Sequence, residues 1–296
     1  MKVLRARATA ATAADVATTV LRLAVLLQAG LAPARAWALT AESGDPVAVR
    51  VRAALEAGEK LPDAIVRQGG AWTSVGAAWT IATTVGAPLA DTLRGIASAL
   101  RDAQETADDV RVTLAEPAGT ARLMAWLPLV AIALGAALGF DTFATLVTNP
   151  LGIACLAAGA FLIVVAHRWT AVLVRRAQPD PGIPGLDAEL LAIALSGGAS
   201  IERARVVVAS TGAGEPDAGV DDVLHLSQRA GVPAVELLKA TAALARHRAR
   251  VEGRLRAARL SSRLLLPLGV CTLPAFLLLG VAPMLLSVMS TMSISL

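Results

Sequence analysis

The chain has 296 residues, of which 55% are hydrophobic, and its mean hydropathy is +0.62. So many apolar residues cannot all be buried in water-soluble cores, so the composition predicts membrane segments and excludes an ordinary soluble protein. The formal charge is +4, but the basic residues cluster beside apolar segments, which favours membrane orientation over nucleic-acid binding.

The N-terminal segment, residues 1–122, is predicted to be helical throughout. Asp15 and Arg22 interrupt the apolar residues near its start, so we expect no cleaved signal peptide. Proline suits the first turn of a helix and glycine its end. We therefore expect a bundle of six helices: from about Val16 to Gly30, Pro33 to about Gly44, Pro46 to about Ala57, a short helix from Pro62, Thr73 to Val85, and a long helix from Pro88 toward Glu116.

Three apolar stretches follow this segment. Residues 123–140, 151–166 and 264–296 contain no charged side chain. A hydrocarbon core about 30 Å thick needs roughly 20 apolar residues of helix. The first two stretches reach that length as helices over about 123–147 and 150–173, joined by a turn into a transmembrane hairpin. The third stretch predicts a transmembrane helix over about 264–288.

The basic residues predict the orientation of the chain. Residues 1–122 carry 13 lysines and arginines and residues 174–263 carry another 13, whereas residues 123–173 carry only Arg168. Basic residues stay on the cytoplasmic side of a membrane. We therefore expect a multi-pass protein of the inner (cytoplasmic) membrane, with the N-terminus and both charged segments in the cytoplasm and the C-terminus outside.

The region after the hairpin repeats the first segment in a shorter form. Leu23–Ala36 recurs as Leu191–Ala204 at an offset of 168, and the break at Gly86 recurs at Gly231 at an offset of 145. The second copy therefore lacks 23 residues in its middle, and one helix, or one helix and part of another, is expected to be missing. After a linker rich in proline and glycine, its expected helices are 187–197, 200–211, 220–230 and 233–262.

The predicted fold is all-α: an integral membrane protein with two cytoplasmic helical bundles, which are copies of one repeated domain, and three transmembrane helices. The domains divide as residues 1–122, the first bundle; 123–173, the hairpin; 174–263, the linker and shorter bundle; and 264–296, the last transmembrane helix and a short outer tail.

The long helices at the ends of the two bundles differ in charge. Residues 101–116 contain two arginines and five acids, whereas residues 246–263 contain seven arginines and one acid, Glu252. Glu252 is placed to pair with the arginines four residues before and after it. Helical spacing divides the arginines into two faces, with an apolar stripe of Val251, Leu255 and Ala258 between them: Arg246, Arg250 and Arg254 on one, and Arg248, Arg256, Arg259 and Arg263 on the other. The seven are candidate contacts, either with lipid headgroups, or with the acidic helix of the other bundle or an acidic cytoplasmic partner.

The membrane segments contain a second candidate site. Gly135 and Gly139 form a Gly-x-x-x-Gly motif, a candidate for close helix packing within the hairpin or for dimerisation. Gly152 and Gly159 lie on the second span. Asp141, the one acid of the hairpin, is expected near the outer interface, since a proton relay would need a second acid in the spans.

No catalytic motif is found in the sequence. It lacks a P-loop, His-Glu-x-x-His, Cys-x-x-Cys and Gly-x-Ser-x-Gly. Cys155 and Cys271 both lie in apolar stretches, the three histidines are scattered, and aromatic residues make up only 3%. We therefore expect no enzymatic activity, no cofactor, no metal and no nucleic acid as partner.

Four stretches, together with the duplication and the order of the segments, carry a family resemblance: Val85–Leu93, Thr120–Leu129, Leu138–Asp141 and Thr148–Gly152. From about residue 16 to 290 the chain resembles the type II secretion system F family, and is most similar to the inner-membrane platform proteins of tight-adherence (Flp-type) pili, the TadB/TadC branch. The resemblance implies a platform without catalytic residues that couples a hexameric cytoplasmic secretion ATPase to pilin extraction. It implies as partners that ATPase, pilin-like subunits, a related platform protein or a second copy of itself, and the lipid bilayer. The shortened second copy leaves a TadB-like, a TadC-like and a merged identity open.

Two other classes of function are compatible with the sequence. A membrane-anchored scaffold or signalling protein unrelated to secretion would need an outside sensor or an output motif, and the outer loops are too short for a sensor. A small transporter would need polar groups in its spans, and Asp141 alone is weak support.

Overall fold

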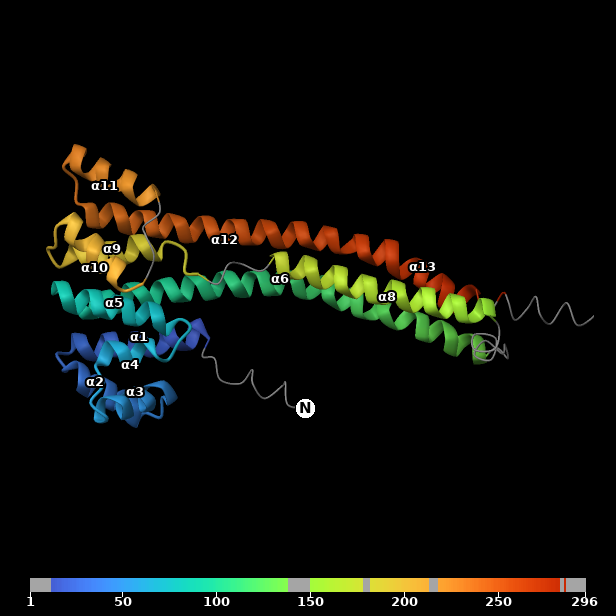
Figure 1. The fold of residues 1–296 in the computed structure, drawn as a ribbon, viewed down its shortest axis with the longest axis horizontal. Coiled ribbons are helices and arrows are strands. Elements are labelled where there is room, and N and C mark those ends of the chain that lie inside the picture. Colours follow the sequence, from blue (N-terminus) through green and yellow to red (C-terminus); the bar gives the residue numbers. More distant parts are fainter. Residues whose placement is uncertain (1–11, 138–149, 178–181, 213–217, 283–284, 286–296) are drawn as a thin grey trace, which may run out of the picture. The chain divides into compact units, whose positions relative to one another are not determined.

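The computed structural model describes residues 12–137, 150–177, 182–212, 218–282 and 285, and every regular element in these ranges is helical (Figure 1). The N-terminal segment forms α1 Ala13–Gln28, α2 Pro33–Glu42, α3 Pro46–Glu56, α4 Leu61–Val66, α5 Trp72–Val85 and α6 Leu89–Ala137. These helices confirm the six that were predicted from the proline and glycine positions. The end of the sixth near Glu116 was wrong, because α6 continues through Pro117 and Gly119 and into the apolar stretch.

Local hydrogen bonds explain where the early helices begin. Thr12 and Asp15 form a capping box at α1, and the two Thr12 donors lower the pKa of the Asp15 carboxyl. The Asp45 carboxylate accepts from the backbone N–H groups of Val47 and Ala48, both at 2.9 Å, and so caps α3. It also accepts from the Thr19 hydroxyl at 2.5 Å, which ties α3 to α1.

The later helices are α8 Pro150–Ala177, α9 Leu186–Ser196, α10 Ile201–Ser210, α11 Ala218–Ala230 and α12 Ala234–Pro267. At the offset of 168, α9 and α10 correspond to α1 and α2; at the offset of 145, α11 and α12 correspond to α5 and α6. The described part of the second copy therefore contains no counterpart of α3 or α4. In the first copy, α3 and α4 lie in the stretch that, from the change in offset, we inferred to be shorter in the second copy.

The chain divides into two compact units. The first consists of Met1–Thr106 and Pro181–Val251, and the second of Ala107–Asp180 and Glu252–Leu296. Both repeats therefore contribute to the first unit, whereas α6 and α12 each contribute to both units.

The two repeats share one hydrophobic core in the first unit. Trp37 lies 5.9 Å from Trp72 and 6.3 Å from Trp79 between ring centroids, and the same core includes Leu190 of α9 and Leu238 of α12. Helix α5 packs against α9 and α10. At this contact Gly197 approaches Val85 so closely that a Cβ atom on Gly197 would lie 2.5 Å from the Val85 carbonyl oxygen. The repeats are thus packed together without space for a larger residue at Gly197.

In the second unit, α8 packs against a helical run that continues from α12 without a loop. This run consists of the π-helical turn η1 Leu268–Thr272, α13 Leu273–Phe276 and the π-helical turn η2 Leu277–Val281. Pro267 ends α12 directly before this run and Pro274 lies within it, and proline removes a backbone donor, which favours such local widening of a helix. The helix boundary predicted at residues 262–264 was therefore wrong.

Two described helices are long and apolar enough to cross a membrane: Pro150–Arg175, and Ala234–Val281 through its apolar C-terminal part. They correspond to the second and third predicted spans. The first span was predicted over 123–147, but residues 138–149 lie outside the described ranges. This first span and the hairpin turn that follows it therefore stay predictions.

Candidate functional site

Three arginines on one face of α12 pair with three acids on α6. Arg246 Nε lies 3.0 Å from Asp102 Oδ2, Arg250 Nη2 lies 3.0 Å from Glu105 Oε2, and Arg254 Nη2 lies 2.7 Å from Asp109 Oδ2. The first two pairs belong to the first unit and the third to the second. Residue numbers rise together along both helices, so the helices run in the same direction. We call these three contacts the α6–α12 ion pairs.

Two of the three α6–α12 ion pairs follow the internal repeat. Glu105 and Arg250 are 145 residues apart, and so are Asp109 and Arg254. This is the offset that relates α6 to α12, so each of these two pairs joins equivalent positions of the two copies, whereas Asp102 and Arg246 are 144 residues apart. Identical residues there would place like charges opposite one another, which destabilises a helix pair. The opposite charges of the two copies therefore favour pairing of α6 with α12 over pairing of either helix with its own kind.

A buried glutamate of α9 joins the first of these ion pairs. Glu189 is 7% exposed, and its Oε2 lies 3.4 Å from Arg246 Nη1. Gly95 of α6 faces the same carboxylate, because a Cβ atom on Gly95 would lie 2.7 Å from Glu189 Oε1. Arg246 thus links acids from two helices, Asp102 on α6 and Glu189 on α9. The absence of a side chain at Gly95 leaves space for the Glu189 carboxylate.

Glu189 was not among the residues predicted from the sequence. A signal was present, since the equivalent position of the first copy, at the offset of 168, is Leu21, an apolar residue packed against the core. An acid that replaces an apolar residue in an otherwise apolar repeat helix indicates a buried partner. The partner itself, Arg246, is 57 residues away and could be identified only from the packing.

Burial decreases along the row of arginines on α12. The side chains of Arg246, Arg250 and Arg254 are 14%, 30% and 60% exposed. Exposed ion pairs contribute little to stability, whereas loss of one partner of a buried pair leaves an uncompensated charge. The stabilising effect should therefore be concentrated at Arg246.

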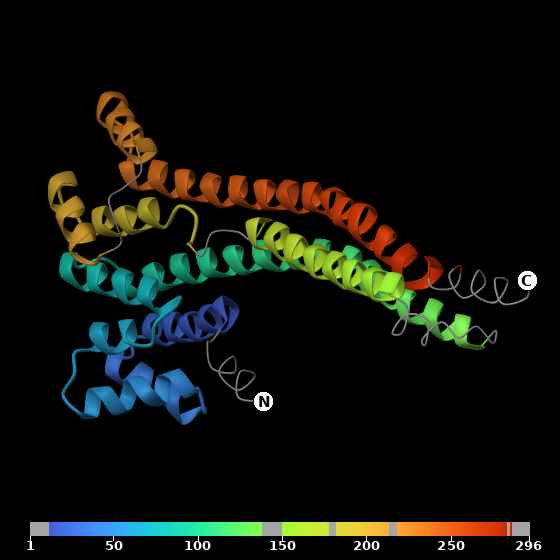
Figure 2. The ribbon, with the colours of Figure 1, turned by 45° about the vertical axis from the view of Figure 1, so that its right-hand side comes forward.

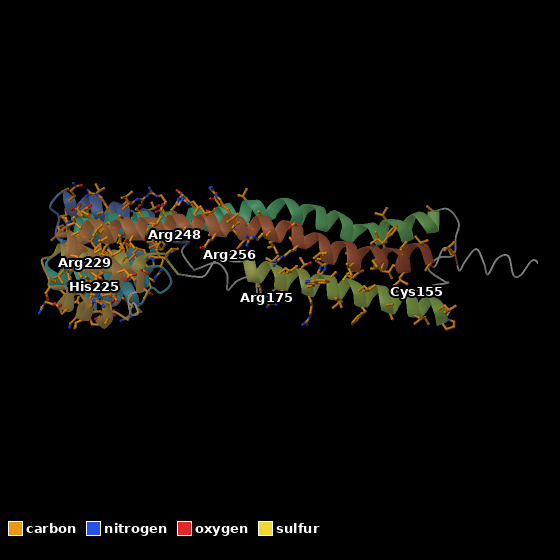
Figure 3. All side chains as sticks on the ribbon, turned by 90° about the horizontal axis from the view of Figure 1, so that it is seen from above. Cys155, Arg175, His225, Arg229, Arg248 and Arg256 are labelled. Atoms are coloured by element: carbon orange, nitrogen blue, oxygen red, sulfur yellow. The ribbon has the colours of Figure 1, made fainter. Side chains whose placement is uncertain are left out.

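The other four arginines lie on the second face of α12, as the helical spacing predicted. Arg256 pairs with Glu252 at 3.1 Å, one of the two i±4 pairs that we expected. Among the described residues, Arg248, Arg259 and Arg263 have no ion-pair partner, and all three are exposed (Arg248 and Arg256 are labelled in Figure 3). Val251 and Leu255 of the predicted apolar stripe are exposed between them. Contact of this face with headgroups or a partner stays a prediction.

The glycine motif of the first span cannot be assessed, because Gly139 lies outside the described residues and Gly135 lies where only the backbone of α6 is described; Asp141 is also outside. A close contact is found instead at Gly159 of α8. A Cβ atom there would lie 2.5 Å from Leu279 Cγ, so α8 approaches the last apolar run at this glycine.

The described side chains suit electrostatic pairing and surface contact. In the ranges that the structure covers, no three histidine, cysteine, aspartate or glutamate side chains are grouped so that they could hold a metal ion. The arrangement around Arg246 positions helices, and the exposed face of α12 is open to a partner or a lipid.

Comparison with known proteins finds one family that matches part of the chain. Residues 19–136 match the family described as type II secretion system (T2SS), protein F, a range that covers most of α1, all of α2–α5 and nearly all of α6. No curated protein and no solved structure matches the chain. Together with two helices able to cross a membrane, this match indicates an inner-membrane protein. Residues 19–136 are therefore similar to the type II secretion system protein F family.

Proposed function

We propose that the protein is the inner-membrane platform of a type II secretion or Flp-type pilus machine. In this role it couples a cytoplasmic secretion ATPase to the extraction of pilin-like subunits from the bilayer and to their assembly. The observation that carries the proposal is the T2SSF domain over residues 19–136, in a chain whose α12 continues from an ion-paired unit into an apolar run.

The continuity of α12 and its apolar extension supports a coupling role. A displacement of the first unit would be passed along a helical run without a flexible loop between its charged and apolar parts. The α6–α12 ion pairs and the buried Arg246 would hold the charged part of this run against α6. A platform needs such a connection, because the ATPase acts in the cytoplasm and the pilin is extracted from the membrane.

The orientation and partners belong to the same proposal. Both repeats and the N-terminus lie in the cytoplasm, since 26 of the 27 basic residues flank the predicted spans on that side. The partners are a hexameric secretion ATPase, pilin-like subunits, and a TadB- or TadC-related platform protein or a second copy of this chain. The chain itself has no P-loop, so the energy of ATP hydrolysis must come from that separate ATPase.

Affinity purification tests the proposal. The tagged full-length chain is crosslinked in its native membranes, extracted in mild detergent and analysed by mass spectrometry. We expect a secretion-type ATPase and short pilin-like proteins to be enriched over a tagged, unrelated inner-membrane protein of similar abundance. Recovery of neither partner after crosslinking, or ATP hydrolysis by the purified chain alone, would contradict the proposal and favour a scaffold unrelated to secretion.

A further inference from the structure

Arg175 of α8 and Arg263 of α12 lie at the same level of the second unit, and α8 also carries the exposed Arg168 nearer its apolar part. Helix α8 packs against η1, α13 and η2, which continue from α12, and it runs in the opposite direction to them (Figures 1 and 2). Their contact at Gly159 and Leu279 aligns them. Arg175 lies 16 residues after Gly159, and Arg263 lies 16 residues before Leu279. Both arginines are therefore roughly 24 Å from the contact along the helix axes.

The side chains on the two sides of this level differ in character. Toward the contact, residues 264–281 carry no charge, and their exposed side chains include Val270 and Leu273. On α8, Phe161 and Val164 are exposed in the same way, and Trp169 is partly exposed nearer the arginines. Apolar side chains that end at a band with tryptophan and arginine are typical of a helix that leaves the hydrocarbon and enters the headgroup region.

The arginines of this band carry uncompensated positive charge. Arg175 of α8, and Arg259 and Arg263 of α12, are exposed and have no ion-pair partner among the described residues (Arg175 is labelled in Figure 3). Residues 150–177 and 253–281 contain no aspartate or glutamate. The arginines of the α6–α12 ion pairs differ in this respect, since their charge is matched by acids of α6.

We propose that Arg175, Arg259 and Arg263 form a binding site for the headgroup of an anionic phospholipid. A guanidinium binds phosphate oxygens through two parallel N–H donors, and arginines from two adjacent helices can hold one headgroup from both sides. The adjacent exposed apolar side chains would lie against the acyl chains. Of the seven arginines of α12 that were predicted as candidate contacts, only Arg259 and Arg263 belong to this lipid site, and Arg175 is added to it from α8. The inference rests on the membrane position in the proposed function and on none of the protein partners.

Lipid binding to the purified full-length chain tests this site. The protein in neutral detergent is titrated with dioleoyl phosphatidylglycerol, with dioleoyl phosphatidylcholine, and with inorganic phosphate, and bound lipid is counted by native mass spectrometry. We expect phosphatidylglycerol to be retained in preference to phosphatidylcholine. The double variant Arg259→Gln/Arg263→Gln should lower the apparent affinity for phosphatidylglycerol roughly tenfold. The control Arg203→Gln/Arg229→Gln removes the same charge at exposed positions of α10 and α11 in the first unit and should bind like the wild type.

Three results would overturn the inference: equal retention of the two lipids by the wild type, an equal loss in the control variant, or full displacement of phosphatidylglycerol by millimolar phosphate. Arg175→Gln on α8 gives a second reading, should the double variant fail to fold as judged by circular dichroism and gel filtration. This single variant should weaken the binding of phosphatidylglycerol and leave the binding of phosphatidylcholine unchanged. Because the assay contains no ATPase or pilin, its failure would leave the platform function open, and failure to recover those partners would leave the lipid site open.

Discussion

Replacing Arg246 with alanine should lower the free energy of unfolding by about 3 kcal/mol. The Arg246 side chain is only 14% exposed, and it lies between Asp102 at 3.0 Å and Glu189 at 3.4 Å. Without the arginine, the buried Glu189 carboxylate would have lost the one cation paired with it among the described residues. The loss therefore reflects an uncompensated buried charge more than the attraction of a single ion pair.

Two other arginines of α12 provide matched controls. Arg254 is 60% exposed, so Arg254→Ala should cost less than about 1 kcal/mol. Arg248 has no ion-pair partner among the described residues, and Arg248→Ala should leave stability within about 0.5 kcal/mol of wild type.

Denaturant unfolding of the full chain in detergent, followed by tryptophan fluorescence, measures these differences. Three of the five tryptophans, Trp37, Trp72 and Trp79, lie in the shared core, and the chain has no tyrosine. Equal losses at Arg246 and Arg248 would contradict the buried ion-pair arrangement.

The second large effect is expected at Gly185, which precedes α9. Its φ of +72° lies in the left-handed region, where an L-residue with a side chain costs about 1–2 kcal/mol. A Cβ atom there would also lie 2.8 Å from both the Cα and the carbonyl oxygen of Ala242. Ala242 is fully buried on α12, so its backbone has little room to move, and overpacking adds about 1–3 kcal/mol. Gly185→Ala should therefore destabilise the first unit by roughly 3 kcal/mol in total.

Gly182→Ala is the control for this prediction. Gly182 lies three residues earlier, has no atom within 4 Å of an added Cβ, and does not have a φ in the left-handed region. The same unfolding measurement should find the two variants separated by at least about 2 kcal/mol. A Gly185→Ala protein as stable as the Gly182→Ala protein would mean that α9 and α12 do not approach one another here.

Much of the helical layout could be predicted from local residues. Pro33 and Pro46 open α2 and α3 at their first position, and Gly86 ends α5 with a φ of +77°. Proline at a first turn and glycine past a last turn follow from backbone geometry alone, so no tertiary information was needed. The two offsets of the repeat likewise identified α9–α12 before their packing was known.

The helix ends near Glu116 and Arg263 were predicted less well. At both places a change from polar to apolar residues suggested a boundary, but a helix can continue through such a change because its backbone hydrogen bonds do not depend on side-chain polarity. Helical spacing correctly separated the two arginine faces of α12. It could not determine whether Arg246, Arg250 and Arg254 contact lipid or α6, since that depends on how two distant helices are aligned.

In the proposed function both repeats lie on the cytoplasmic side of one membrane, where an ATPase can act on them. Cysteine labelling tests it most directly. With Cys155 and Cys271 replaced by alanine, a single cysteine is placed at exposed Arg35 of α2 or at exposed Arg229 of α11. Spheroplasts are then treated with a membrane-impermeant maleimide before or after permeabilisation. We expect labelling of both positions only after permeabilisation. Labelling of either position in intact spheroplasts would contradict it.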